Sequence, residues 1–241
     1  YPNTNKVLLL SSDGNSDLWA DTWDGSAPSS SVWVDRSGGA TLEGSLSSAT
    51  TEVYDFSFRL ALSPSFDQSA YRIFDNNDGT QVGDTALVSQ DATTTVTGAG
   101  KQFRLRMLLH VAQSQASSEA FKLQFATSTG GACIGLSYED VTTATAISFY
   151  NNATPADGAA MTASSTDPTH SGHTVVAQTY EEANNFSVST AIPSGQHGKW
   201  DFSLYNNVAT NASTYCLRAV FSSGSEIERY SKYPALPMDI P

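Results

Sequence analysis

The stretch KQFRLRMLLHVA, residues 101–112, decides the class of fold. Apolar side chains at every second position, from Phe103 to Leu109, alternate with Arg104 and Arg106. Successive side chains of a β-strand point to opposite faces, so this period of two predicts a strand with one face on a core.

The same alternation recurs along most of the chain, and helical periodicity is nearly absent. One stretch, Gln178–Asn185, is compatible with a helix but is too short to change the class. Turn residues separate the strands about every 8–12 residues, which is typical of a sandwich or barrel. The predicted strands are Lys6–Ser11, Asp17–Trp23, Ser31–Asp35, Thr51–Leu62, Ala70–Phe74, Thr93–Thr97, Lys101–Ala112, Phe121–Ala126, Ala146–Tyr150, Thr174–Val176, Lys199–Tyr205, Thr214–Phe221 and Ile227–Tyr230.

A shift in composition near Leu62-Ser63-Pro64-Ser65 predicts two regions. Residues 1–62 form a Trp-rich N-terminal β-hairpin region, with a hairpin turn at Asp13-Gly14-Asn15. Residues 63–241 form the main β domain. Its tail, Tyr233–Pro241, holds three prolines, which exclude it as a central strand and predict an extended edge, a linker or a docking peptide.

The charge balance excludes some partners. Twelve Lys and Arg against 24 Asp and Glu give a net charge of −12 and a pI of about 4.5. Nucleic acid and anionic membrane surfaces need a basic face, so neither is an expected partner. No apolar stretch is long enough to span a bilayer. The sparse charge and the start at Tyr1 lead us to expect an extracellular or cell-surface protein, in a mature form without its signal peptide.

The chain has two cysteines, Cys133 and Cys216, and no CxxC motif. Two lone cysteines cannot build a structural zinc site by themselves. In an oxidising compartment they are expected to form one disulfide. The alternative is a pair of buried free thiols.

A set of motifs across residues 66–233 resembles a family of uncharacterised extracellular β-sandwich domains. These domains occur in large Ser/Thr-rich bacterial surface proteins, including those of candidate-phylum bacteria. LWADTWDGS (18–26) also resembles the Trp-Asp/Asn-Gly hairpins that often precede them. The motifs are YRIFDNN (71–77), FRLRMLLHV (103–111), FKLQFA (121–126), NNATPADG (151–158), DPTH (167–170), YEEANNF (180–186), GKWDFSL (198–204) and YCLRAV (215–220).

The resemblance implies secretion and no catalytic residues. It also implies an Ig-like sandwich, and together with the strand pattern we expect an Ig-like or jelly-roll antiparallel β-sandwich. Cys133 and Cys216 match the cysteine positions of the family, which supports the disulfide.

Two turns carry oxygen ligands near the spacing of a calcium loop. The first lacks the glycine that such a loop needs at its sixth position, and the second has its glycine one place early. We favour polar turns and expect no cofactor, with calcium as the alternative. The residues concerned are Asp13, Asn15, Asp17, Asp75 and Asn77.

The four histidines are His110, His170, His173 and His197, and two of them follow Asp167 in one loop. Two imidazoles and a carboxylate can hold zinc. Gly172 lies between the loop histidines, so no regular face aligns them. Solvated loop histidines, and no metal, are the favoured interpretation.

Two further sets of residues point to the surface. Trp19, Trp23 and Trp33 are either core residues or a sugar-stacking platform. The sequons at Asn152, Asn185 and Asn211 are candidate glycosylation sites.

The sequence holds no nucleophile elbow, zinc-protease motif or phosphate loop, so a non-enzymatic protein is expected. The expected function is that of a structural cell-surface or pilus-like filament subunit, whose partners are its own copies or neighbouring surface-protein domains. Strand addition would join them. The first donor is Val7–Leu10 within residues 5–12, unless this is an internal core strand, and the tail is the second. The alternative function is a carbohydrate-binding or adhesive module.

Overall fold

A computed structural model describes residues 20–21, 31–32, 63–76 and 86–240, with side chains for the last two ranges. The chain divides into two units, Tyr1–Arg59 and Leu60–Pro241. The predicted boundary after residue 62 stays a prediction, because most of residues 1–62 lie outside the described part.

All regular structure in the described residues is β-strand, so the all-β prediction is confirmed there. The strands are β1 (Ala20–Asp21), β2 (Ser31–Val32), β3 (Ser65–Asp75), β4 (Val96–Thr97), β5 (Gln102–Ala112), β6 (Phe121–Ser128), β7 (Glu139–Asp140), β8 (Ile147–Phe149), β9 (Val175–Glu181), β10 (His197–Asn206), β11 (Thr214–Phe221), β12 (Arg229–Tyr230) and β13 (Ala235–Asp239). In the first unit β1 pairs with β2 antiparallel, and the predicted hairpin turn lies outside the described residues.

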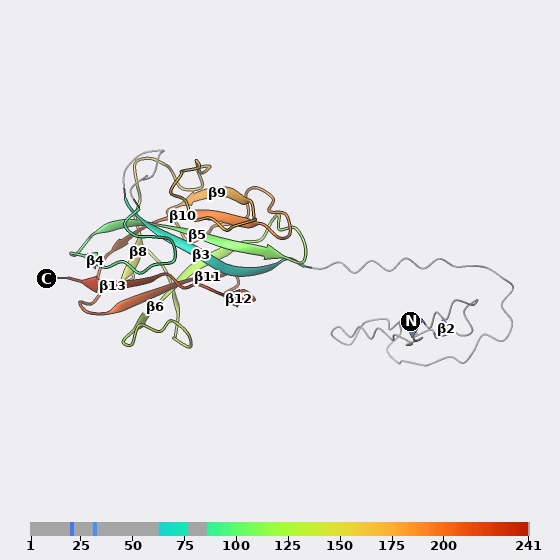
Figure 1. The fold of residues 1–241 in the computed structure, drawn as a ribbon. Helices are drawn as coiled ribbons and strands as arrows, with labels where there is room; N and C mark the ends of the chain where they lie inside the picture. The colour runs from blue at the N-terminus through green and yellow to red at the C-terminus, as the bar shows by residue number, and fades with distance from the viewer. Residues whose placement is uncertain (1–19, 22–30, 33–62, 77–85, 241) are drawn as a thin grey trace. The chain divides into compact units, whose positions relative to one another are not determined.

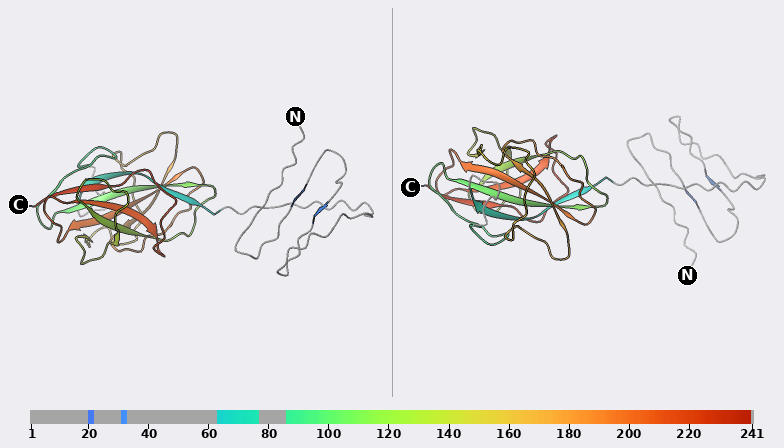
Figure 2. Two further views of the ribbon diagram at one scale, coloured as in Figure 1. Left: turned by 90° about the horizontal axis from the view of Figure 1, so that it is seen from below. Right: turned by 90° about the horizontal axis from the view of Figure 1, so that it is seen from above.

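The second unit contains two sheets, which form two layers (Figures 1 and 2). The first sheet has the order β12-β3-β5-β10-β8, and β9 lies beside β10. The second has the order β4-β13-β11-β6-β7. Long antiparallel pairs dominate both sheets, β3 with β5, β5 with β10 and β6 with β11.

Alternation along β5 and β10 gives the first sheet two different faces. Leu105 faces Phe202 and Met107 faces Trp200 on the inner side, where both pairs are buried. The outer side carries polar residues opposite one another, such as Arg106 and Asp201. Contrary to the expected half-buried pattern, these outer residues are buried as well.

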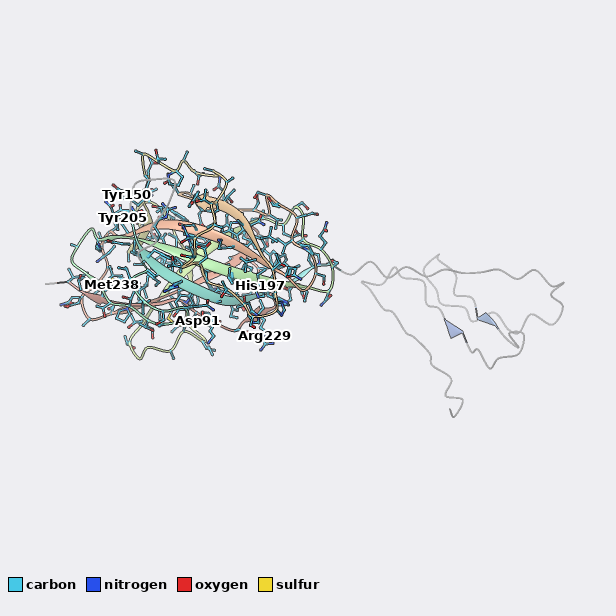
Figure 3. All side chains as sticks on the ribbon, turned by 45° about the horizontal axis from the view of Figure 1, so that its top comes forward. Asp91, Tyr150, His197, Tyr205, Arg229 and Met238 are labelled. Carbon is cyan, nitrogen blue, oxygen red and sulfur yellow. A yellow bond between two sulfur atoms is a disulfide. The ribbon has the colours of Figure 1, made fainter. Side chains whose placement is uncertain are left out.

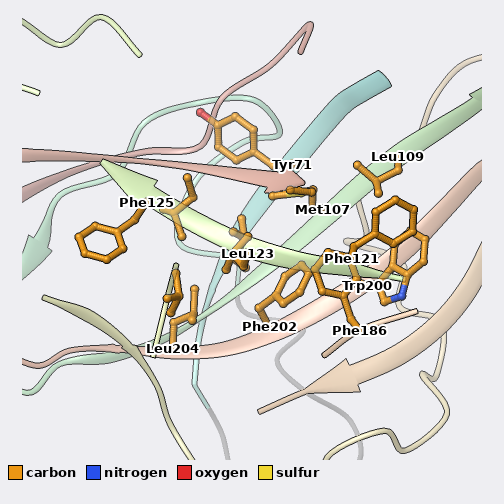
Figure 4. Packing of buried hydrophobic residues seen from close by; sticks show 14 of the residues in the cluster. Tyr71, Met107, Leu109, Phe121, Leu123, Phe125, Phe186, Trp200, Phe202 and Leu204 are labelled. Carbon is orange, nitrogen blue, oxygen red and sulfur yellow. The ribbon is translucent and has the colours of Figure 1, made fainter. Parts of the chain in front are cut away.

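The inner faces of both sheets meet in one core (Figure 4). Phe121 of β6 packs edge-on against Trp200 of β10, with ring centroids 6.0 Å apart. Phe186, from the β9–β10 connection, stacks on Phe121 at 5.4 Å and meets Phe202 edge-on at 4.9 Å. Aromatic contacts of this kind join the two layers.

Both sheets are mixed, so the prediction of a purely antiparallel fold is wrong. β9 runs parallel to β10, β12 to β3 and β4 to β13. A parallel pair needs a long crossover. The connection 182–196 supplies it for β9 and β10, and it is anchored on the way by the backbone bridge between Ala120 and Ser187.

The structure also corrects the prediction for the proline-containing tail. It forms β13, which lies between β4 and β11, although its prolines predict that it cannot be a central strand. The Met238 amide donates to Ser213 on the β11 side, so the nitrogen of Pro237 faces the other side. β4 pairs only with Met238 and Asp239, so no ladder hydrogen bond is needed from Pro237.

Candidate functional site

Several predicted site residues fall outside the described part of the chain, and their roles stay predictions. They are the strand-exchange segment Val7, Leu8, Leu9 and Leu10, the tryptophans Trp19, Trp23 and Trp33, and the calcium candidates Asp13, Asn15, Asp17 and Asn77. Asp75, the remaining calcium candidate, accepts a hydrogen bond from Lys101 Nζ at 2.7 Å. Its carboxylate therefore already has a cationic partner.

A disulfide joins Cys133 to Cys216, the pairing that the sequence predicts. Cys133 lies in the β6–β7 loop and Cys216 is a buried residue of β11. Their Cα atoms are 5.6 Å apart, within the usual range for a disulfide. The bond ties an exposed loop to the middle of the second sheet.

The three candidate glycosylation sites differ in exposure. The Asn152 side chain is buried, and its Nδ2 donates to Ser203 Oγ at 2.9 Å. A glycan would attach to that same nitrogen, so the structure argues against Asn152 as an acceptor. Asn185 and Asn211 are exposed.

Loops cover parts of the outer edges of the first sheet. On β3, the Leu87 amide donates to the Ile73 carbonyl oxygen at 2.9 Å. On β9, the Met161 amide donates to the Gln178 carbonyl oxygen at 3.0 Å. Such covers protect a sheet from pairing with another chain.

A side chain covers part of the second sheet's edge. Asn184 accepts from the Leu123 amide at 2.5 Å and donates to the Leu123 carbonyl oxygen at 3.0 Å. It therefore bonds to β6 as a neighbouring strand would. A strand added at this edge would first have to displace Asn184.

Three half-buried tyrosines gather near Arg218 of β11: Tyr138 from the β6–β7 loop, Tyr230 of β12 and Tyr233 from the connection to β13. The ring centroids of Tyr230 and Tyr233 are 5.3 Å apart, and those of Tyr138 and Tyr233 are 6.4 Å apart. The guanidinium carbon of Arg218 lies 4.1 Å from the centroid of the Tyr138 ring. Burial is the main reason that the pKa of Tyr230 rises to about 12. The cluster is thus an aromatic surface beside the ion pair of Arg218 and Glu226, whose Nη1 and Oε1 atoms are 2.5 Å apart.

The outer face of the first sheet holds a buried charge network. Asp201 accepts hydrogen bonds from Arg104 Nε at 2.5 Å and from Arg106 Nε at 2.6 Å. Asp167, in the β8–β9 loop, pairs with both Arg106 and Lys199. The loop therefore lies over this face and supplies a carboxylate that these buried cations need.

All four histidines of the chain meet at one end of the same face. His197, at the start of β10, lies directly opposite His110 of β5, with ring centroids 4.8 Å apart. His170 and His173 approach from the β8–β9 loop, with centroids 4.8 and 5.1 Å from that of His197. Figure 3 labels His197 at this end and Tyr205 near the other end of β10.

The protonation of the cluster follows from its contacts. His173 Nδ1 lies 2.6 Å from the Gly195 carbonyl oxygen, which only accepts, so Nδ1 is a donor and the neutral tautomer that fits this contact has its lone pair on Nε2. Burial, together with the three neighbouring histidines, lowers the pKa of His197 to about 4. Burial also lowers the pKa of His110. The neutral imidazoles that result are the form that ligates metals.

Sequence reasoning treats His170 and His173 as solvated loop residues and does not bring His110 and His197 to them, so it misses the cluster. The alternation in β5 and β10 places His110 and His197 on the outer face. The predicted strand 101–112 contains His110, whereas the predicted strand 199–205 begins two residues after His197. Only the tertiary structure shows that β5 and β10 are neighbours in this register. It also shows that the β8–β9 loop returns over these two strands.

No described helix is long and apolar enough to cross a membrane. No family model matches the sequence, and no curated protein matches it either.

Proposed function

We propose that the chain is a non-enzymatic extracellular structural protein, a cell-surface or filament subunit built on an Ig-like β-sandwich. Two layers that share one core support the sandwich. The disulfide supports an oxidising compartment, where such bonds persist. The low charged fraction of 15% is in keeping with a secreted β protein.

The position of β13 is the observation that best supports assembly by strand exchange. This strand places Leu236 and Met238 in the core, and it forms three residue pairs with β11 and two with β4. Backbone hydrogen bonds such as that from the Leu217 amide to the Pro234 carbonyl oxygen extend the contact with β11 beyond these pairs. A short strand with apolar anchors is the kind of element that copies of a chain exchange. Because the outer edges are partly covered, exchange of an existing strand fits this unit better than addition to an open edge.

Residues 5–12, with Val7 to Leu10, remain the other proposed donor. Their apolar run has the composition of a donated strand. The two proposed donors can be distinguished by experiment. A disulfide that ties β13 to its own domain would prevent exchange of β13 but not of residues 5–12.

The experiment compares four forms of the full chain by size-exclusion chromatography with light scattering and by electron microscopy. The first is the unaltered chain and the second lacks residues 1–12. The third, Thr214→Cys with Pro237→Cys, locks β13 to β11, because these residues are paired across the ladder. The fourth is its matched control, Thr214→Ser with Pro237→Ser.

We expect the unaltered chain and the serine control to form filaments or large oligomers. If only the locked form stays monomeric, β13 is the donor. If only the truncated form stays monomeric, residues 5–12 are the donor. Assembly that survives in both forms would overturn strand exchange. An unaltered chain that stays monomeric well above micromolar concentration would overturn the filament proposal.

The tyrosine cluster favours a second candidate function, glycan binding. Aromatic faces stack on pyranose rings, and Arg218 lies beside these rings. Binding to a glycan array should then be lost in Tyr138→Ala and Tyr233→Ala. It should persist in the control Tyr150→Ala, which alters a half-buried tyrosine that packs against Tyr205 instead. Equal binding by all variants would exclude the cluster.

A further inference from the structure

The histidine cluster brings metal-binding atoms together. One ring nitrogen each of His170, His173 and His197 lies within 4.8 Å of the others. Two of these residues come from the β8–β9 loop and one from β10, so the cluster joins two elements. A metal site requires ligand atoms that point to one position. The sequence spacing of the two loop histidines alone does not bring three such atoms together.

A second observation concerns His197. This side chain is 1% exposed, and its Nδ1 atom is buried without a hydrogen-bond partner among the described residues. Buried polar atoms are almost always paired, so an unpaired one needs an explanation. A ligand that lies among the histidine rings would provide it.

The tautomer of His173 also suits a metal. Its Nδ1–H donates to the Gly195 carbonyl oxygen at 2.6 Å, so Nε2 is available to a ligand. A ligating histidine typically donates its other N–H to a carbonyl or carboxylate group in this way.

We propose that His170, His173 and His197 bind one divalent late transition-metal ion, Zn²⁺ first, and that the ion fastens the β8–β9 loop to the start of β10. Imidazole is a preferred ligand of Zn²⁺, Cu²⁺ and Ni²⁺. Both cysteines are in the disulfide, so no thiolate competes for the ion. Three imidazoles form the ligand set of zinc sites that keep a fourth position for water.

The geometry requires a small closure. Zn–N bonds of about 2.0–2.1 Å in a tetrahedral site place the nitrogens about 3.3 Å apart. The ligand atoms lie within 4.8 Å of one another, so their separations need to shorten by at most about 1.5 Å. His170 is an exposed loop residue that can close by a change of rotamer, and the exposed loop can bring His173 closer while it keeps its bond to Gly195, whereas His197 is held in the sheet.

The test uses the full chain without a polyhistidine tag, because its own four histidines all lie in the cluster. Protein treated with EDTA is titrated with Zn²⁺ by calorimetry and with Co²⁺ by absorption spectroscopy. The variants are His170→Ala, His173→Ala and the double variant, all at exposed positions. Ser171→Ala, an exposed residue of the same turn, is the matched control.

We expect one ion per chain for the unaltered protein and for Ser171→Ala. Each single histidine variant should bind at least about 10-fold more weakly, and the double variant should not bind. Far-UV circular dichroism of the metal-free variants checks that the fold is unchanged. Absence of binding by the unaltered chain, or equal binding by the double variant, would overturn the proposal.

Limited proteolysis tests the fastening role separately. Zn²⁺ should slow cleavage within residues 162–174 in the unaltered chain and in Ser171→Ala, but not in the double variant. Binding without protection of this loop would show that the ion does not fasten it.

Discussion

Burial changes the chemistry of Glu181, at the end of β9. Its side chain is 3% exposed, and burial is the main cause that raises its pKa to about 7, with Asp157 adding to the rise. The Thr179 hydroxyl donates to its carboxylate and opposes the rise. The folded state therefore binds this proton more tightly than the unfolded chain, whose glutamate has a pKa near 4.5.

A pH-dependent loss of stability follows. Glu181 stabilises the fold below about pH 4.5, and this contribution is lost as the pH rises through about 7. Glu181→Gln should raise the free energy of unfolding by up to about 3 kcal/mol at about pH 8 and by much less at about pH 4. Urea unfolding measured between about pH 4 and pH 8 checks this prediction. The exposed control Glu139→Gln should keep the slope of the unaltered chain, and the same slope in Glu181→Gln would contradict the prediction.

Gly198 in β10 shows a residue whose lack of a side chain matters. A Cβ atom there would lie 2.4 Å from Ile192 Cδ1 and 2.7 Å from two ring carbons of Trp200. Both neighbours are fully buried, so they cannot move away freely. Gly198→Ala should lower the free energy of unfolding by roughly 1–3 kcal/mol, as overpacking does.

The matched control is Gly130→Ala, where an added Cβ meets nothing within 4 Å. That variant should change stability by less than about 0.5 kcal/mol. Thermal or urea unfolding of both variants makes the comparison. Equal stability of the two would show that the core around Trp200 adapts more easily than its packing suggests.

At the scale of elements, one buried glutamine holds the β9–β10 crossover in place. Gln178 Oε1 accepts from the amides of Ser189 and Thr190 at 2.9 and 3.0 Å, and its Nε2 donates to the Thr190 carbonyl oxygen at 2.9 Å. The crossover is what allows β9 and β10 to run parallel.

Gln178→Leu should release this segment. The lost hydrogen bonds leave backbone groups unpaired, at a cost of about 1–3 kcal/mol. Hydrogen exchange should speed up at Ser189 and Thr190, with little change in β11. Gln178→Glu keeps the acceptor for both amides, so we expect an intermediate effect. Unchanged exchange at Ser189 and Thr190 in Gln178→Leu would contradict this role.

At the scale of the whole unit, the disulfide closes a loop with a sequence separation of 83. Cys133→Ala with Cys216→Ala should lower the free energy of unfolding by about 3–5 kcal/mol in the chain-entropy account. Alanine avoids placing a hydroxyl at position 216, which is fully buried. Urea unfolding measures the change, and a loss below about 1 kcal/mol would mean that the bond contributes little.

Strands were the easiest part to predict from the sequence. Alternation over residues 101–112, 121–126 and 214–221 depends only on neighbouring residues, and strands are found at all three places. The helix-compatible stretch at Gln178 is misleading because short polar segments carry little periodicity, and its first residues belong to β9. The tail is misjudged because a proline excludes a strand only where its nitrogen must donate.

The sequence by itself determined the all-β class of the described unit and the two cysteines available for a disulfide, because both depend on local pattern and residue type. Only the tertiary structure decided the parallel pairs, the place of β13, the charge network around Asp201 and the meeting of four histidines. The last two features join residues from β5, β10 and the β8–β9 loop, which are far apart along the chain, and the first two likewise join strands distant in sequence. Their contacts depend on strand register and on the path of crossovers, which follow from how the whole core packs.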